Sequence, residues 1–164
     1  MKTNIGEYVA GAYLQVVKDC DVVNYNVKNT DNGMKGMNEF DVLALNLTSF
    51  DAYLCEVSTH LNGFNYGKGN KNTIAKLNNK FINMQEYASK LQLKFNVHYM
   101  FWSPYVPKGY LTNEIEILET KGLEAIVNSK YKDCINELKE KAKVTTKDYN
   151  NPFYLSLQIL SHLR

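Results

Sequence analysis

Two carboxylates in apolar surroundings are the side chains of this sequence best suited to chemistry. Asp41 lies in the run Phe-Asp-Val-Leu-Ala-Leu, and Glu56 lies in the run Ala-Tyr-Leu-Cys-Glu-Val. An acid inside such a run is costly to bury unless another group compensates its charge. For each acid a purely structural explanation stays open, since it can be solvated at a strand end or paired with a lysine.

The two acids belong to neighbouring predicted strands. Residues 38–47 and 52–58 are rich in β-branched and apolar side chains, and the short turn at 48–51 joins them as a hairpin. Side chains alternate along a strand with period two, so the pairing across the turn decides which residues share a face. The position of the turn therefore decides whether the two acids meet.

The predicted register brings Asp41 and Glu56 together. Pairing that continues from the turn places Leu43 opposite Glu56. It also places Asp41 opposite Ser58, so the two acids are diagonal neighbours on one face, roughly 7 Å apart. Two carboxylates this close repel unless one is protonated or a cation lies between them. A divalent metal fits, because Mg²⁺ takes one or two carboxylates together with water and phosphate oxygens.

The remaining sequence predicts the elements that must position these acids. Runs of β-branched and aromatic residues predict strands at 20–28, 38–47, 52–58, 94–102 and 123–128, with a turn signal at 29–36 after the first. Apolar periodicity and capping residues predict helices at 4–18 and 72–91, after the cap Asn113, from Ser129 and from Pro152. The order α-β-β-β-α-β-α-β-α-α, with its first three strands as an antiparallel meander, predicts an α/β fold with a mixed sheet in one domain spanning 1–164.

Composition excludes several classes of protein. The chain has 164 residues, of which 45% are hydrophobic and 22% charged, so it is neither disordered nor fibrous. A formal net charge of +2 is too small to argue for nucleic-acid binding by itself. Three widely spaced cysteines without a CxxC pair indicate buried reduced thiols rather than a zinc site. Because no signal peptide or long apolar segment is evident, we expect a cytoplasmic protein with no membrane association.

Three acids in successive elements carry a family resemblance. Glu7 stands in the first helix, Asp41 in the second strand and Glu56 in the third. This arrangement resembles the PD-(D/E)xK nuclease superfamily, whose restriction-endonuclease-like core has the order α-β-β-β-α-β. The resemblance covers residues 4–102, which leaves residues 103–164 as a C-terminal helical extension packing on that core.

The resemblance implies a metal-dependent nuclease that hydrolyses phosphodiester bonds, with DNA favoured over RNA as the substrate. Carried over residue by residue, it implies that Glu7, Asp41 and Glu56 bind Mg²⁺ or Mn²⁺ together with the main-chain carbonyl of Val57. In such enzymes the metal activates water and stabilises the pentavalent phosphate. Many nucleases of this fold act as dimers, so a homodimer is an open alternative to a monomer.

The sequence departs from the family at one position. Where the family has a lysine two residues after the second acid, this chain has Ser58, which cannot supply a positive charge. Two replacements are conceivable. Lys76 or Lys80 can point back to the sheet from the following helix. Alternatively, Thr59 or His60 can take part of the role, His60 on the face of Glu56 if that strand continues so far.

Two other functions compete with a nuclease. The first is a catalytically inactive protein of the same fold that serves as an accessory module binding nucleic acid or protein. The second is an interaction domain whose strand acids are ordinary surface residues. The nuclease hypothesis requires Glu7, Asp41 and Glu56 to converge on one pocket with a lysine from the helix at 72–91 nearby.

Overall fold

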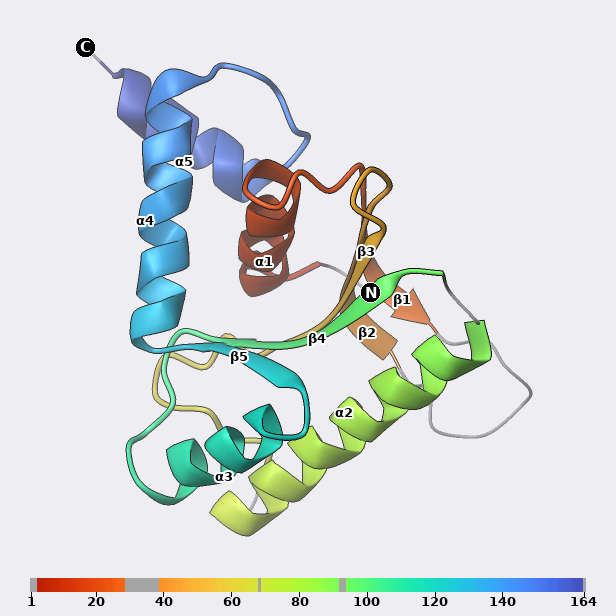
Figure 1. Ribbon diagram of the computed structural model, residues 1–164. Coiled ribbons are helices and arrows are strands. Elements are labelled where there is room, and N and C mark those ends of the chain that lie inside the picture. Colours follow the sequence, from red (N-terminus) through yellow and green to blue (C-terminus); the bar gives the residue numbers. More distant parts are fainter. Residues whose placement is uncertain (1–2, 29–38, 68, 92–93, 164) are drawn as a thin grey trace.

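The computed structural model describes residues 3–28, 39–67, 69–91 and 94–163. The predicted turn at 29–36 lies outside these described residues. Their fold is α/β, with a mixed sheet whose described strands are flanked by helices on both faces (Figure 1). The order of these elements along the chain is the predicted one.

The elements agree with the predicted ones to within a few residues at most ends. The strands of the described sheet are β1 (Val22–Lys28), β2 (Glu39–Asn46), β3 (Asp51–Val57), β4 (Asn96–Ser103) and β5 (Leu123–Val127). The helices are α1 (Ile5–Val16), α2 (Asn70–Leu91), α3 (Tyr110–Glu119), α4 (Ser129–Val144) and α5 (Pro152–His162). Of the helices in the described ranges, none is long and apolar enough to cross a membrane.

The sheet has its strands in chain order. Strands β1, β2 and β3 form the predicted antiparallel meander, whereas β4 pairs in parallel with β3 and β5 in parallel with β4. The C-terminal extension contributes β5, the strand at the end of the sheet, where the sequence predicts a strand at 123–128. Parallel pairing requires crossover connections, and α2 and α3 provide them.

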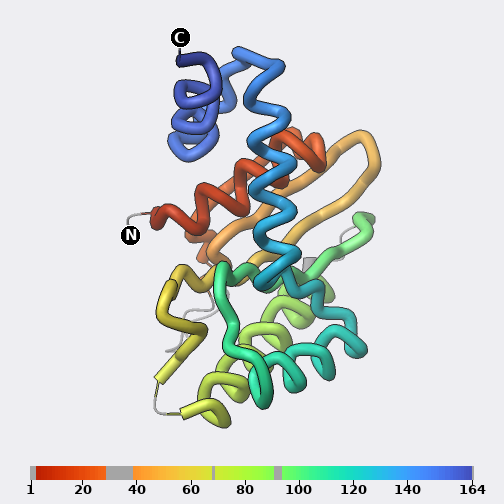
Figure 2. Tube along the Cα trace, turned by 90° about the vertical axis from the view of Figure 1, so that its left-hand side faces the viewer, coloured from red at the N-terminus to blue at the C-terminus, as the bar shows by residue number. Residues whose placement is uncertain are grey.

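Helices cover the two faces of the sheet in different groups. On one side α1 and α4 pack against the sheet around the buried Trp102, and α5 packs against both helices (Figures 1 and 2). On the other side α2 and α3 form a second core with Phe101 and the buried Leu54. The apolar stripe of α2 predicts this placement, because its buried members are spaced at helical intervals: Ile74, Leu77, Phe81, Met84 and Ala88.

The hairpin register differs from the predicted one by two residues. Leu43 lies opposite Leu54 rather than opposite Glu56. The difference arises because the turn is longer than predicted, so that the strands close at Asn46 and Asp51. A shift of two residues preserves the face of every side chain, so Asp41 and Glu56 remain on one face.

The start of α3 was also predicted wrongly. The helix begins at Tyr110, so Asn113 lies inside its first turn and is not the cap. The cap is Gly109, whose φ of 108° suits a glycine, and its main-chain N–H donates to Thr112 Oγ1 at 3.0 Å. The Asn-x-x-Glu pattern at Asn113 is a capping signal that also occurs within helices, which explains the error.

Candidate functional site

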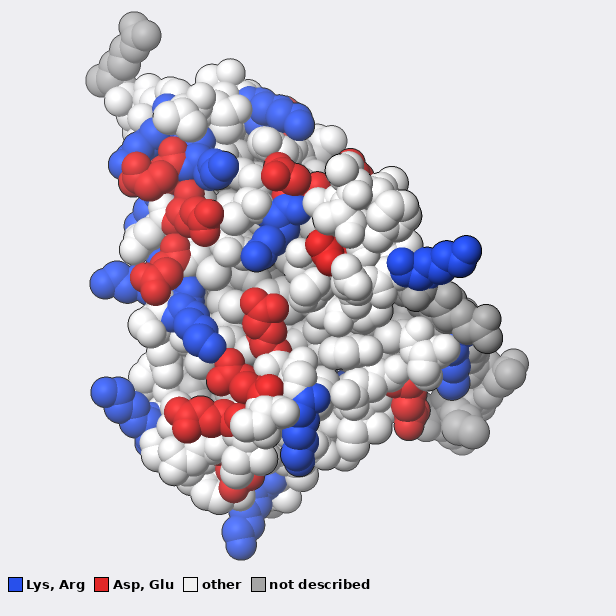
Figure 3. Space-filling view, in the orientation of Figure 1, with Lys and Arg blue, Asp and Glu red and all other residues white. Residues whose placement is uncertain are grey.

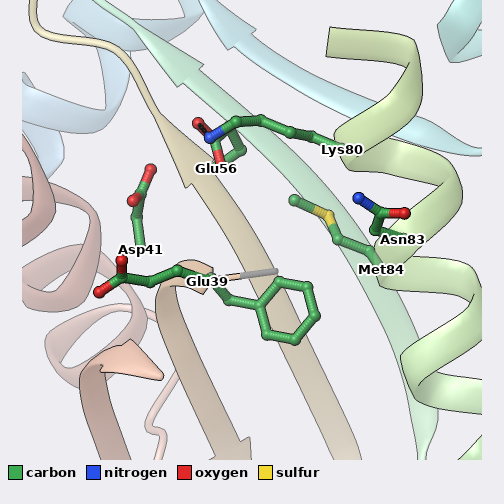
Figure 4. Close-up of a pocket in the computed structure, with 7 residues that line it drawn as sticks. Glu39, Asp41, Glu56, Lys80, Asn83 and Met84 are labelled. Atoms are coloured by element: carbon green, nitrogen blue, oxygen red, sulfur yellow. Dashed lines mark hydrogen bonds and ion pairs between the residues drawn. The ribbon is translucent and has the colours of Figure 1, made fainter. Parts of the chain in front are cut away.

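A cavity of about 230 Å³ lies between the start of β2, the end of β3 and the middle of α2 (Figure 4). Three acids and one lysine share its wall with the side chains of a phenylalanine, an asparagine and a methionine. The lining residues are Glu39, Phe40, Asp41, Glu56, Lys80, Asn83 and Met84. The volume falls below the range of ~300–1,000 Å³ typical of pockets for drug-sized molecules, and suits a hydrated ion or a phosphate group.

Glu56 is the most deeply buried acid of this cavity, with only 2% of its surface exposed. Its Oε1 accepts a hydrogen bond of 2.7 Å from the hydroxyl of Tyr66 and forms an ion pair with Lys80 Nζ. Its Oε2 is buried and has no hydrogen-bond partner among the described residues. A buried carboxylate oxygen without a partner is costly, so this atom is a candidate ligand for a cation.

Lys80 reaches Glu56 from α2. A lysine from this helix was one of the two proposed replacements for the family lysine that is absent at Ser58. The side chain extends from α2 toward the sheet and ends at the Glu56 carboxylate (Figure 4). Lys76, one helical turn earlier, donates instead to the carbonyl oxygen of Tyr66 at 2.5 Å. Of these two lysines, Lys80 is therefore the one that lies at the acids.

Asp41 lies beside Glu56 at the point where β2 and β3 cease to pair. Its Oδ2 accepts a hydrogen bond of 2.7 Å from the main-chain N–H of Val57. Burial raises the pKa of Asp41, while the Val57 N–H, the charge of Lys80 and the neighbouring Glu56 carboxyl, as a hydrogen-bond partner, act in the opposite direction. Burial and then the charge of Asp41 raise the pKa of Glu56 to about 7, against the opposing effect of Lys80. The two acids thus interact as the sequence predicts.

Glu7 is buried close to these acids but does not line the cavity. It is the third residue of α1, where it forms a capping box with Asn4. Its Oε2 also accepts a hydrogen bond of 3.1 Å from Asn26 Nδ2. Burial and then the charge of Asp41 raise the pKa of Glu7, so the two carboxylates are within electrostatic reach. Asp41 and Glu56 therefore line one cavity and Glu7 does not, so the convergence of three acids that the nuclease hypothesis requires is met only in part. The predicted role of Glu7 as a metal ligand stays a prediction.

Ser58 and His60 lie outside the cavity lining. Ser58 is buried, its N–H donates to the carbonyl of Trp102 at 2.8 Å, and its Oγ has no partner among the described residues. Strand β3 ends at Val57, so the condition that placed His60 on the face of Glu56 is not met. His60 is exposed in the following loop, where it lines a separate surface depression.

Sequence reasoning missed two residues of this site. Glu39 stands two residues before Asp41 in β2, and its Oε1 is buried with no partner in the described structure. Period-two alternation could have identified it, because it extends the acidic face of the strand by one position. Tyr66 lies in a glycine-rich loop that showed no periodicity, so no local signal connects it with Glu56.

Comparison with known proteins assigns no family. The sequence matches no protein-family model, and no curated protein is significantly similar to it. Within the described residues, no group of three or more His, Cys, Asp or Glu side chains is arranged to hold a metal ion. The arguments for function therefore depend on the cavity, where three carboxylates outnumber one lysine and favour a cation.

Proposed function

We propose that this chain is a metal-dependent nuclease of the restriction-endonuclease-like type, which hydrolyses phosphodiester bonds of DNA. The observation that carries the proposal is the meeting of an acid on β2, an acid on β3 and a lysine from α2 at one cavity. These residues are Asp41, Glu56 and Lys80. Lys80 supplies from the helix the positive charge that Ser58 cannot supply from the strand.

The donor atoms at the cavity fit Mg²⁺ or Mn²⁺. Glu56 Oε2 is buried without a partner, and Asp41 lines the same cavity. Val57 donates its N–H to Asp41, and the N–H and C=O of one strand residue point to the same edge, so its carbonyl is the expected third ligand. Mg²⁺ needs few protein ligands, because waters and substrate phosphate oxygens complete its shell.

A bound metal would supply a Lewis acid and a water of lowered pKa for attack on phosphorus. The protein contributes the remaining functions through its own side chains. Lys80 places an ammonium group beside Glu56, where it can hold a non-bridging phosphate oxygen and neutralise charge developing on the phosphate. The cavity, of about 230 Å³, is large enough for a phosphate group.

The face shown in Figure 3 offers little to bind the DNA backbone. Basic and acidic side chains are intermixed on it, and no wide basic surface is present there. Along α4, for example, the lysines alternate with acids in the stretch Lys-Asp-Cys-Ile-Asn-Glu-Leu-Lys-Glu-Lys. We therefore expect weak binding to intact DNA and a strong dependence on the divalent cation.

One observation favours a second candidate, an inactive module of the same fold that binds nucleic acid or protein. The ion pair of Lys80 with Glu56 already compensates the buried acid, so the fold does not need a metal there. The absence of a group of three metal-binding side chains among the described residues agrees with this alternative. Metal binding and cleavage are therefore measured separately.

The decisive experiment is cleavage of supercoiled plasmid and of single-stranded DNA in MgCl₂ or MnCl₂, with RNA in parallel. We expect Asp41→Asn and Lys80→Met to lose at least ~100-fold in rate, as for groups that act on the transition state. Asp51→Asn, at the start of β3 and outside the cavity lining, and Lys90→Met, at the far end of α2, are the matched controls.

Calorimetry with Mn²⁺ distinguishes the two candidates. A nuclease binds the ion in the wild type and loses that binding in Asp41→Asn, whereas Asp51→Asn binds normally. Binding without cleavage of any of the three substrates would support the inactive module. A wild type that binds no Mn²⁺, even with an oligonucleotide added, would refute the metal-dependent nuclease.

A further inference from the structure

The loop between β3 and α2 is a structured support rather than a simple linker. We call residues 61–67 the Tyr66 loop, after the residue that touches the site. Phe64, near its middle, is buried and packs against the rings of Tyr66 and Phe101, with centroids 4.8 Å and 4.7 Å away. These contacts anchor the loop to the core on the side of the sheet that α2 covers.

Two residues of α2 hold the main chain of Tyr66. Its N–H donates to Thr73 Oγ1 at 3.1 Å, and its carbonyl accepts from Lys76 Nζ at 2.5 Å. Thr73 is itself buried and also donates to the carbonyl of Gly69 at 3.1 Å. Because both polar groups of its backbone are occupied, Tyr66 is fixed relative to the helix that carries Lys80.

The Tyr66 side chain contacts the two central groups of the site. Its hydroxyl donates to Glu56 Oε1 at 2.7 Å, and its ring lies 5.4 Å from Lys80 Nζ. Burial and the charge of Glu56 raise the pKa of Tyr66, so the phenol stays protonated and remains a donor. A cation within about 6 Å of a ring face is attracted to it, which helps to hold Lys80 in place.

From this geometry we propose that Tyr66 is the positioning residue of the metal site. Its hydroxyl and Lys80 together hold Oε1 of Glu56, which would leave Oε2 as the oxygen available to a divalent cation bound at the cavity. The inference rests on the proposed function, because it concerns the same carboxylate. It assigns a task to a loop that contains Gly63 and Gly67 and joins β3 to α2.

The test is Mn²⁺ binding by calorimetry on the full chain, with no substrate present. Tyr66→Phe removes the hydroxyl and keeps the ring that packs on Phe64, whereas Tyr66→Leu removes both. Tyr99→Phe removes a hydroxyl from β4, at a position paired with Leu54, and is the matched control. Near-ultraviolet circular dichroism of each variant verifies that it is folded.

We expect Tyr66→Phe to weaken Mn²⁺ binding by about 10–100-fold, the usual effect of losing a residue that orients a metal ligand. Tyr66→Leu should weaken binding at least as much, and Tyr99→Phe should leave it unchanged. If Tyr66→Phe binds Mn²⁺ as tightly as the wild type, the positioning role is wrong, even if Tyr66→Leu fails through lost packing. If the wild type binds no Mn²⁺, the metal site itself is refuted and this role with it.

Discussion

Glu56 is deeply buried although only one of its two carboxylate oxygens has partners, and this burial has a cost in stability. Lys80 and Tyr66 both act on Oε1, whereas Oε2 is buried with no hydrogen-bond partner among the described residues. Proteins accept such a group when it serves a function, since the most stable residue at the position would be uncharged. The free energy of unfolding should therefore depend measurably on the ionisation of this one side chain.

We predict that Glu56→Gln raises the free energy of unfolding more at pH 8 than at pH 5. The difference between the two changes should be about 2 kcal/mol. The pKa of Glu56 is raised to about 7 from the usual 4.5, so the folded state binds this proton more tightly than the unfolded state does. The stabilisation that comes from this tighter proton binding is fully present below pH 4.5 and is lost as the pH rises through 7. Urea denaturation across this range measures the difference.

The control for this prediction is Glu116→Gln, at an exposed position of α3. It should shift the free energy of unfolding by less than about 0.5 kcal/mol, equally at both pH values. A pH dependence for Glu56→Gln that matches the wild type would show that Glu56 is not the titrating acid. The proposed cation site would then lose its best-supported ligand.

Helix α2 determines which lysine serves the site. Lys76 and Lys80 are four residues apart and therefore lie on the same side of the helix, one turn from each other. The sequence alone could not show which of the two lysines lies at the acids, because this depends on the position of α2 along the sheet. Packing of Phe81 and Met84 in the core sets that position and places Lys80 at the acids.

We predict that Lys76→Met and Lys80→Met differ strongly in activity. Lys76 binds the carbonyl of Tyr66 and supports the loop, so its loss should reduce cleavage less than ~10-fold. Lys80 acts at the acids, and its loss should reduce cleavage at least ~100-fold. Initial rates on plasmid DNA provide the comparison, and equal losses in both variants would contradict the assignment of Lys80.

Local sequence patterns predicted the elements better than the contacts between them. Apolar spacing within α2 and the Asn-Pro start of α5 are local signals, and both helices lie where they were predicted. The hairpin register was wrong by two residues because the turn length is not encoded by side-chain alternation. The contact of Tyr66 with Glu56 joins two segments through tertiary packing, so only a structure could identify it.

The C-terminal helices are joined to the first helix by a small buried polar centre. Asn151 caps α5 by accepting from the N–H of Tyr154 at 3.0 Å. Its Nδ2 donates to the carbonyl of Tyr8 in α1 at 2.9 Å and to the hydroxyl of Tyr25 in β1 at 3.1 Å. Gly11 permits this arrangement, since a Cβ there would overlap the Tyr25 hydroxyl. One side chain thus links α5, α1 and β1.

We predict that Asn151→Ala destabilises the whole molecule and not α5 alone. The variant loses a helix cap and two further hydrogen bonds, to half-buried groups of Tyr8 and Tyr25, which should cost about 2–3 kcal/mol of unfolding free energy. For a chain of this size the melting temperature should fall by roughly 5–10 °C. Far-ultraviolet circular dichroism follows the helices, while fluorescence of the buried Trp102 follows the centre of the sheet.

Comparison of circular dichroism with Trp102 fluorescence shows whether the C-terminal extension, residues 103–164, unfolds together with the sheet. Trp102 packs against Tyr13 of α1 and Tyr131 of α4, so loosening of the helical layer should reach it directly. We expect both probes to shift by the same amount in one transition, and Asn136→Ala, at an exposed site of α4, to shift neither by more than ~2 °C. If the helical signal melts early while Trp102 fluorescence stays native, residues 103–164 do not stabilise the core that holds the acids. The cavity would then depend on β1–β4, α1 and α2 alone.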